Sequence, residues 1–473
     1  MKGLSYEELM ARKNQIVKEA VGIDYDDFEY GKIAFDYNRM MSESTYSLEE
    51  MIKIQKETKV GNTPLLELKN INKLIKKYAE AGKGARIFVK DEAANPSGSF
   101  KDRRASISVY HAKKLGYEGV VSATSGNFGA AVASQAAQRG LKCIIIQEVY
   151  DSKKVGQPEI LEKTRKCEAY GAEVIQLTVG PELFYTFLKT LEETGYFDAS
   201  LNVPFGVAGV ETLGYEIANQ MMELEGKYPD IVVATTAGGG NLTGTARGLI
   251  KAGAINTEIV AASVNLYGLS MASDNDFNKK SFTTGHTGFG IPRAINPDGT
   301  DVPRNVSRIF RYMDRFVTIT QGEVFYATEA LSQLEGLERG PAGNTSLAAA
   351  IGIAMKTDKD KIIVVQETEY TGAGKHPMSQ LTFAKRNGIE VRRGNPKEDK
   401  PGVNIIIPEK FYQINEQNID IEDLKIRYIK NLVNKYDIKT IEKEDFEFII
   451  EDTNSDANFV RASLENLGVK VLV

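Results

Sequence analysis

From about residue 85 onwards, short runs of β-branched residues alternate with longer amphipathic stretches, and this pattern restricts the fold more than any other feature. Nearly continuous apolar runs are typical of strands that are buried on both faces of a sheet. The stretches 128–139, 158–170 and 241–251 carry apolar residues at helical spacing. Such alternation predicts an α/β fold with parallel sheets covered by helices. The expected strands are 86–90, 119–122, 142–147, 173–177, 231–235, 258–264 and 361–366.

The composition excludes several classes of protein. The 473 residues are 42% hydrophobic and 26% charged, which suits a globular protein with a large core. The net charge of -5, without a long run of one sign, argues against nucleic acid as a partner. The apolar runs are too short to span a bilayer, and the charged N-terminal segment is unlike a signal peptide, so we expect a cytoplasmic protein. Two cysteines and three histidines leave no pattern for a metal site.

We expect two lobes with an extension at each end of the chain. The predicted units are a helical N-terminal extension (1–60), a large domain (61–105 and 210–395), a smaller α/β domain (106–209) and a C-terminal extension (396–473). The last extension follows the turn-forming segment 395–404, which is typical of a linker. Residues 270–310 break the alternation with several glycines and prolines, and a loop of that length is typical of a lid or a binding loop.

One lysine stands at the start of a predicted helix. Lys101 follows the turn-forming residues 95–99 and lies in the first helical turn. The positive end of the helix dipole disfavours the charged form of a lysine there, which helps to free its amine as a nucleophile. Lys101 is therefore a candidate for forming a Schiff base. A solvated lysine in a helix cap explains this motif, taken alone, about as well.

Two loops that each follow a strand and precede a helix are candidates for binding anions. Thr124, Ser125 and Gly126 offer hydroxyls and backbone amides for a carboxylate, and Asn127 offers an amide for a phenolic oxygen. The segment 237–241 contains three consecutive glycines, which let the backbone approach a phosphate closely. It lacks the lysine of a Walker loop and the spacing of a dinucleotide turn, so it predicts a single phosphate. Taken singly, each loop is also compatible with an ordinary helix cap or tight turn.

A fourth motif, 368–375, follows the last predicted strand, and its Thr371 can hydrogen-bond to a ring nitrogen. In this order along the chain, and with the opening segment 61–65, the motifs resemble those of pyridoxal-phosphate enzymes of fold type II, the tryptophan synthase β-like enzymes. The resemblance covers about residues 58–392. It implies pyridoxal 5'-phosphate as the cofactor and a two-lobed fold of parallel-rich sheets with helical extensions at both ends.

The same resemblance implies a role for each residue of the motifs. Lys101 is the expected Schiff-base and catalytic lysine, and Asn127 is expected at the phenolic oxygen of the cofactor. The expected phosphate ligands are Gly238, Gly239, Gly240, Asn241 and Leu242, the expected partner of the pyridine nitrogen is Thr371, and the expected substrate ligands are Thr124, Ser125 and Gly126.

Within that fold, the whole length resembles the β subunits of 2-amino-4-oxopentanoate thiolases, including the segments 283–290 and 336–350. These enzymes take part in ornithine degradation. The resemblance implies cleavage of 2-amino-4-oxopentanoate by coenzyme A (CoA) to acetyl-CoA and alanine, with D-alanine as the expected isomer. It also implies a small α subunit as partner, and a homodimer of β chains is compatible with it.

Two alternative functions stay open at this point. A threonine synthase-like enzyme, or another lyase or β-replacing enzyme of fold type II, would share all four motifs. A protein that holds the cofactor without turnover, as a scaffold for a partner subunit, would share them too, although the intact Lys101 argues against it.

The residues that handle CoA are not evident from the sequence. Cys143 and Cys167 lie far from the cofactor motifs and are expected to be structural, so the attacking sulfur should come from CoA itself. His286 and His376 are candidates for deprotonating the thiol or polarising the ketone, although an exposed loop position is the more common interpretation of such histidines. Scattered bases in the 270–310 loop are typical of solvated surface: Lys279, Lys280, Arg293, Arg304 and Arg308. We expect a partner subunit to complete the CoA site.

Overall fold

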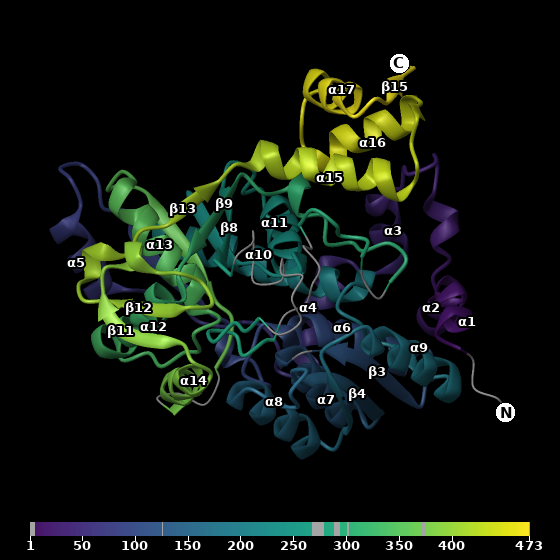
Figure 1. Cartoon of the computed structure of the whole chain (residues 1–473), viewed down its shortest axis with the longest axis horizontal. Helices are drawn as coiled ribbons and strands as arrows, with labels where there is room; N and C mark the ends of the chain where they lie inside the picture. The colour runs from purple at the N-terminus through teal and green to yellow at the C-terminus, as the bar shows by residue number, and fades with distance from the viewer. Residues whose placement is uncertain are drawn as a thin grey trace.

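The computed structural model describes residues 5–124, 126–266, 279–287, 294–299, 302–370 and 375–472. Its strands form two main sheets that are covered by helices (Figure 1). The larger sheet has seven strands in the order β1 (Leu65–Glu67), β2 (Arg86–Asp91), β10 (Ile362–Glu367), β7 (Ile231–Thr235), β8 (Glu258–Val264), β9 (Arg315–Ile319) and β13 (Gln417–Ile419). The five inner strands run parallel, whereas β1 and β13 are antiparallel edges.

The smaller sheet has four parallel strands in the order β5 (Glu173–Thr178), β4 (Lys142–Tyr150), β3 (Gly119–Thr124) and β6 (Phe197–Asp198). Every residue of β3 and of β10 is buried, which explains why these strands read as continuous apolar runs. The predicted α/β class is confirmed. All seven strands expected from the sequence are present, with ends that differ by a few residues.

Helices precede, separate and follow these strands. The N-terminal helices are α1 (Tyr6–Ala11), α2 (Lys13–Val21), α3 (Tyr37–Ser44), α4 (Leu48–Glu57) and α5 (Lys69–Tyr78). The central helices are α6 (Lys101–Lys114), α7 (Asn127–Arg139), α8 (Pro158–Ala169), α9 (Glu182–Thr194), α10 (Pro204–Glu225), α11 (Gly240–Lys251), α12 (Gln321–Glu335), α13 (Asn344–Lys356) and α14 (Lys375–Arg386). The C-terminal helices are α15 (Ile421–Lys435), α16 (Lys443–Thr453) and α17 (Ala457–Asn466).

Helix α10 joins the two lobes, because it packs against both α6 and α11. Close packing needs glycine here: a Cβ at Gly214 of α10 would overlap the carbonyl oxygen of Thr245 in α11. Helix α6 begins at Lys101, the predicted nucleophilic amine, and helix α11 begins at Gly240, in the loop that is predicted to bind the phosphate. The tight contact with α10 therefore fixes the distance between these two motifs.

The C-terminal extension is not separate from the larger lobe. Its strand β13 pairs with β9, and β11 (Glu390–Gly394) pairs in parallel with β12 (Asn404–Pro408). The suggested linker, 395–404, thus joins two paired strands. The last two strands, β14 (Thr440–Ile441) and β15 (Lys470–Val471), pair with each other near the end of the chain. The division into four units stays a prediction.

Both extensions form ion pairs with the irregular segment before β9. Arg304 pairs with Glu29 of the N-terminal extension (Nη2 to Oε1, 2.5 Å). Arg308 pairs with Asp298 (Nη1 to Oδ1, 2.9 Å) and with Asp452 of α16 (Nη2 to Oδ2, 2.5 Å). The expectation that these bases are solvated surface is wrong for Arg304 and Arg308, whose side chains are buried. It failed because two of their carboxylate partners, Glu29 and Asp452, lie far away in the sequence.

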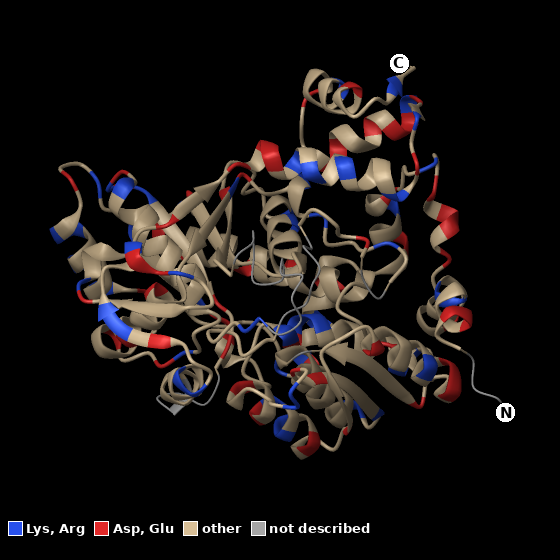
Figure 2. Ribbon diagram, in the orientation of Figure 1, with Lys and Arg blue, Asp and Glu red and all other residues tan. Residues whose placement is uncertain are grey.

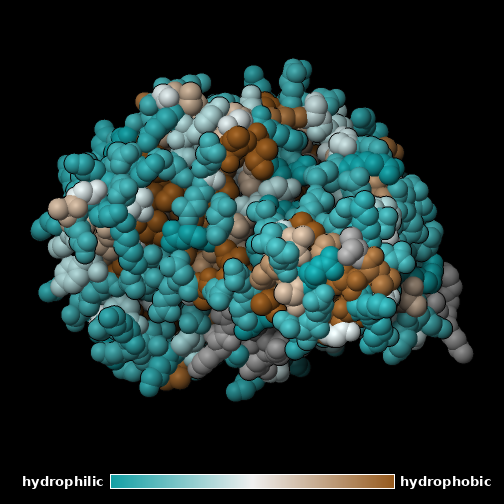
Figure 3. Space-filling view, turned by 90° about the horizontal axis from the view of Figure 1, so that it is seen from above, coloured by the Kyte–Doolittle hydropathy of each residue, from teal (hydrophilic) through white to brown (hydrophobic). Residues whose placement is uncertain are grey.

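The surface carries both signs of charge. Lys, Arg, Asp and Glu are interspersed along the outer helices (Figure 2). Seen from above, the molecule is mostly hydrophilic, with several separate groups of apolar residues (Figure 3).

In the part of the chain that the structure describes, no helix combines the length and the apolar character needed to cross a membrane.

Candidate active site

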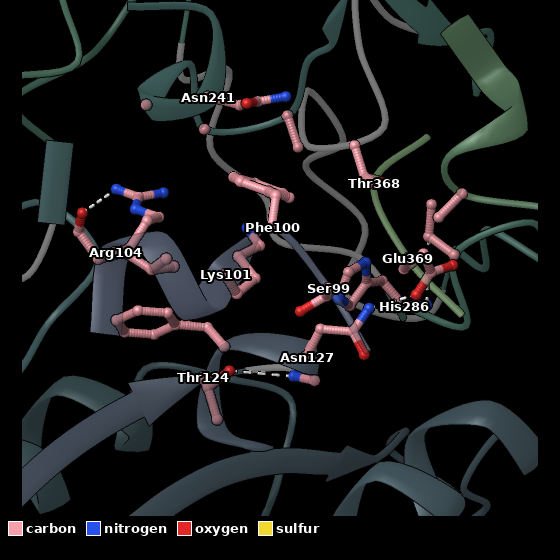
Figure 4. A pocket seen from close by; sticks show the side chains of 18 of the residues that line it. Ser99, Phe100, Lys101, Arg104, Thr124, Asn127, Asn241, His286, Thr368 and Glu369 are labelled. Atoms are coloured by element: carbon pink, nitrogen blue, oxygen red, sulfur yellow. Dashed lines mark hydrogen bonds between the residues drawn. The ribbon is translucent and has the colours of Figure 1, made fainter. Parts of the chain in front are cut away.

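A cavity of about 190 Å³ lies where the two lobes meet. Its walls come from the start of α6 and from the loops that follow β3, β7 and β10, which are the carboxyl ends of parallel strands. The residues that line it include Ser99, Lys101, Arg104, Thr124, Gly126, Asn127, Lys163, Gly238, Gly239, Gly240, Asn241, Thr284, His286, Thr368 and Glu369. Figure 4 shows Lys101 near the middle of the labelled side chains, with Asn241 and Arg104 on one side and Asn127, Ser99, His286 and Glu369 on the other.

The amine of Lys101 lies in a cationic and desolvated environment. Its pKa is lowered to about 7, mainly by burial and also by the charges of Arg104 and Lys163, against an opposing contribution from Glu369. The amine therefore carries no charge in a large fraction of molecules at neutral pH, as a nucleophile requires. The sequence indicates only the effect of the helix dipole, whereas desolvation is the largest cause of the shift.

The neighbours of Lys101 hold the helix start in place. Arg103 is fully buried and pairs with Glu92 (Nε to Oε2, 2.7 Å) and with Glu216 (Nη2 to Oε2, 2.8 Å). Asp102 accepts a hydrogen bond from the backbone N–H of Ser97 (2.7 Å). These contacts lock the turn before α6, so the position of Lys101 is set by the fold.

The loop after β3 presents Asn127 to the cavity. The hydroxyl oxygen of Thr124 accepts hydrogen bonds from the backbone N–H groups of Gly126 (3.1 Å) and Gly129 (3.2 Å), which shapes the loop. The side-chain amide of Asn127 donates to Glu369. Thr124, Gly126 and Asn127 line the cavity, while Ser125 lies outside the described residues.

The loop after β7 forms an anion cradle. Helix α11 begins at Gly240, preceded by Gly239 with a left-handed backbone (φ +84°). A Cβ at Gly239 would overlap the side chain of Ile309, and a Cβ at Gly240 would lie 2.6 Å from Nη2 of Arg104 and 2.9 Å from Oγ of Ser307. Only glycine leaves room between this backbone and a guanidinium group. Gly238, Gly239, Gly240 and Asn241 line the cavity, whereas Leu242 is buried and is not among the lining residues.

Two charged residues of the cavity escaped the sequence analysis. Arg104 stands three residues after Lys101, and on a helix this spacing places both side chains on one face. The sequence could therefore have indicated that Arg104 lies near Lys101. Lys163 of α8 gave no signal, because it comes from a helix without a recognisable motif. It is buried, pairs with Glu159, and its Nζ lies 3.6 Å from Oε2 of Glu369.

The other residues that the sequence suggested as candidates do not all lie in the cavity. Thr371 lies outside the described residues, as does the side chain of His376. His286 is partly buried and lines the cavity, so the interpretation of an exposed loop histidine is wrong for it. Cys143 and Cys167 are buried and do not line the cavity, and burial raises the pKa of the Cys167 thiol to about 12. Among the described residues, no group of three or more His, Cys, Asp or Glu could hold a metal ion.

Comparison with known proteins identifies the family. The family model described as pyridoxal-phosphate dependent enzyme matches residues 56–368. The chain is also 64% identical over 466 residues to a 2-amino-4-ketopentanoate thiolase beta subunit from Acetoanaerobium sticklandii, covering 98% of this chain and 99% of that protein. The chain belongs to this family of pyridoxal-phosphate-dependent enzymes. A second protein of the same description, from an unknown prokaryotic organism, is 63% identical over 470 residues, which are 99% of this chain and 100% of that protein.

A solved structure shows the same fold. A cysteine synthase from Entamoeba histolytica aligns with a TM-score of 0.52 at 22% sequence identity, covering 69% of this chain and 88% of that chain. The predicted fold type II is confirmed.

The residues of the cavity fit pyridoxal phosphate. The glycine cradle offers backbone N–H groups at a helix start, which is a favourable site for a phosphate. The hydroxyl of Ser307, beside Gly240, is buried without a hydrogen-bond partner, and so is the hydroxyl of Thr243 in the first turn of α11. A phosphate in the cradle would provide an acceptor next to Ser307 and a counter-charge for Arg104.

Proposed function

We propose that this chain, together with a small α subunit, cleaves 2-amino-4-oxopentanoate with CoA to give acetyl-CoA and alanine, with D-alanine as the expected isomer. The names 4-oxopentanoate and 4-ketopentanoate denote the same compound. The observation that carries the proposal is the identity of 63–64% to thiolase beta subunits over nearly the full length of both chains. The cavity supports it, because Lys101, the glycine cradle 238–240 and the loop that is proposed to bind the substrate carboxylate all line the same space.

In this proposal the described residues hold the cofactor from two sides. Gly238, Gly239, Gly240 and Asn241 bind its phosphate, with Arg104 as counter-charge. Asn127 donates a hydrogen bond to the phenolic oxygen in place of the one it gives to Glu369. Thr371 remains the proposed partner of the pyridine nitrogen, and Leu242 can contribute only through its backbone.

The proposed chemistry follows from the amine of Lys101. Pyridoxal phosphate, when bound, supplies an electron sink that stabilises negative charge on carbons near the substrate nitrogen. Lys101 attaches the cofactor through Nζ and, once the substrate amine replaces it, is placed to move the proton at C2 of the substrate. The loop formed by Thr124, Ser125 and Gly126 binds the substrate carboxylate. Because both cysteines are buried as thiols, the attacking sulfur is that of CoA.

The partner subunit completes the proposal. The relatives are named beta subunits, which implies a second kind of chain for this family. We assign no residue of this chain to the nucleotide part of CoA, because Arg304 and Arg308 are occupied by carboxylates. A homodimer of β chains and a cytoplasmic location also remain part of the proposal.

An assay of acetyl-CoA formation tests the function. Purified chain with pyridoxal phosphate, 2-amino-4-oxopentanoate and CoA is measured with and without the small subunit. We expect cofactor binding by the chain alone and acetyl-CoA formation that rises strongly when the small subunit is added. Full activity of the isolated chain, unchanged by the partner, would contradict the assigned role of the α subunit.

Threonine synthase activity is the alternative to exclude. Threonine synthases match this chain at lower identity, for example 28% over 69% of the chain for that of Methanocaldococcus jannaschii. Release of phosphate from phosphohomoserine, without acetyl-CoA formation from 2-amino-4-oxopentanoate, would favour this alternative over the thiolase.

A further inference from the structure

The cavity contains a second lysine that the proposed function has not used. Lys163 of α8 lines it, and its Nζ contacts two buried carboxylates, Glu159 one turn earlier and Glu369 after β10. It lies beside the substrate loop, because a Cβ at Gly126 would be 3.0 Å from Cδ of Lys163 and 3.7 Å from its Nζ. Lys163 thus borders the space next to the proposed carboxylate site.

The two carboxylates keep Lys163 positively charged. Burial lowers its pKa, but the charges of Glu159 and Glu369 outweigh burial and raise the pKa above its usual value. A charged ammonium group has three N–H donors and no acceptor. The two carboxylates occupy two of its directions, so one donor can serve a ligand in the cavity.

The charges around Lys163 favour a neutral ligand group. A substrate carboxylate placed there would face Glu159 and Glu369, and like charges in a desolvated site repel strongly. A ketone oxygen accepts a hydrogen bond without bringing a charge, and it gains a favourable interaction with the ammonium when it becomes negative during a reaction. The site therefore discriminates against the C1 carboxylate of an amino acid and in favour of a carbonyl on its side chain.

We infer that Lys163 is a further catalytic residue, whose ammonium group binds the C4 carbonyl oxygen of the substrate. The inference rests on the proposed thiolase function. The thiol of CoA releases its proton to water and its sulfur bonds to C4, while the carbonyl electron pair moves to the oxygen beside Lys163. The C=O bond then re-forms as the C3–C4 bond breaks. Its electron pair goes to C3, which takes up one proton, so acetyl-CoA and the alanine skeleton result.

A pair of ligands isolates the contact to the ketone. The holoenzyme is titrated with 2-amino-4-oxopentanoate and with 2-aminopentanoate of the same configuration, which lacks only the C4 oxygen, and binding is followed by the cofactor absorbance. In Lys163→Met we expect at least a tenfold loss of affinity for the ketone ligand, because a hydrogen bond to a charged group is lost. The affinity for 2-aminopentanoate should change less than twofold. With the small subunit present, kcat for acetyl-CoA formation should fall about 10²–10³-fold.

Two further variants make the result decisive. Arg165→Met removes one positive charge from the exposed face of α8 and should leave both affinities unchanged. Lys163→Met leaves buried carboxylates without their cation and can weaken folding. Lys163→Met combined with Glu159→Gln relieves that imbalance, and we expect it to show the same selective loss for the ketone ligand.

The outcomes separate this inference from the proposed function. Equal losses for the two ligands would show that Lys163 acts on a group they share, such as the carboxylate, and would overturn the inference. Unchanged affinities with unchanged kcat would overturn it too. If the wild-type enzyme with its small subunit forms no acetyl-CoA, the thiolase proposal fails, whereas the comparison of the two ligands still reports whether Lys163 recognises the ketone.

Discussion

Lys101 and Lys163 line the same cavity, yet their surroundings shift their pKa values in opposite directions. Burial, together with the charges of Arg104 and Lys163, lowers the pKa of Lys101 to about 7. Lys163 is also buried, but Glu159 and Glu369 raise its pKa. The difference teaches that burial alone does not make a lysine nucleophilic. At Lys101 the charge of Glu369 opposes the lowering without overcoming it, whereas at Lys163 two carboxylates outweigh burial. This difference supports the proposal that one amine forms a bond and the other stabilises charge.

The largest expected effect comes from removing the nucleophile. Lys101→Ala should abolish the borohydride-reducible attachment of pyridoxal phosphate and lower turnover at least about 10³-fold, because both the attachment and the proton transfer are lost. Peptide mapping of the reduced wild-type protein checks the assignment. A reduced cofactor attached to Lys163 instead would show that Lys163, and not Lys101, is the nucleophile. Lys101→Arg is the control that keeps the positive charge without a free amine.

A smaller effect is expected at the phosphate cradle. Gly239→Asp adds a side chain where Ile309 leaves no room and a negative charge where we place a phosphate. We expect pyridoxal phosphate affinity to fall about 100-fold, measured by titrating the apoprotein. Gly171→Asp is a matched control, since Gly171 has a similar φ of +87° and no atom within 4 Å of its would-be Cβ. Unchanged affinity in folded Gly239→Asp would move the phosphate site elsewhere.

Arg104→Met should have an effect of about tenfold on the affinity for pyridoxal phosphate, because one charge-assisted contact to the phosphate is lost. Its loss should also raise the pKa of Lys101, since Arg104 contributes to the lowering. The neighbouring Arg103→Met provides the contrast. That variant breaks a buried ion-pair network, so it should lower the thermal midpoint, and cofactor affinity of the folded protein should hardly change. Equal cofactor affinities for Arg104→Met and wild type would show that Arg104 does not contact the phosphate.

The last expected effect, no larger than that of Arg104→Met, concerns pH. Because the pKa of Lys101 is lowered to about 7, the uncharged amine predominates above pH 7 and is lost as the pH falls below it. The rate at which the apoprotein attaches pyridoxal phosphate should therefore fall about tenfold from pH 8 to pH 6 and level off above pH 8. Glu369→Gln should shift the midpoint to lower pH, because Glu369 opposes the lowering. A rate that keeps rising towards pH 10 would show that Lys101 has the pKa of an ordinary lysine.

The order of strands and motifs could be predicted from the sequence because it depends on local patterns. Short buried strands such as 231–235 can be recognised as apolar runs. Lys101, Asn127 and Gly239 stand at or directly before the starts of helices that come after such strands. The edge strand β13 (Gln417–Ile419) has only three residues and no such run, so it was not foreseen.

Long-range charge pairing could not be predicted in the same way. Nothing local marks Glu369 as the partner of Lys163, which lies more than 200 residues earlier in the chain. Arg308 was interpreted as surface for the same reason, since Asp452 meets it only in the folded chain. The motifs predict where the cofactor binds, whereas the charge states of the groups around the proposed site depend on tertiary contacts.

The ion pairs of Arg304 and Arg308 limit how this protein can be shortened. The family model ends at residue 368, which suggests trimming both extensions to obtain a minimal catalytic core. Removal of α16 would take Asp452 from the buried guanidinium of Arg308, which directly follows Ser307 at the phosphate cradle. Removal of the first 60 residues would likewise take Glu29 from Arg304. A truncated chain would thus leave the buried Arg304 without Glu29 and the buried Arg308 with Asp298 but without Asp452, next to the proposed phosphate cradle. Expression designs and domain fusions should therefore keep both ends intact.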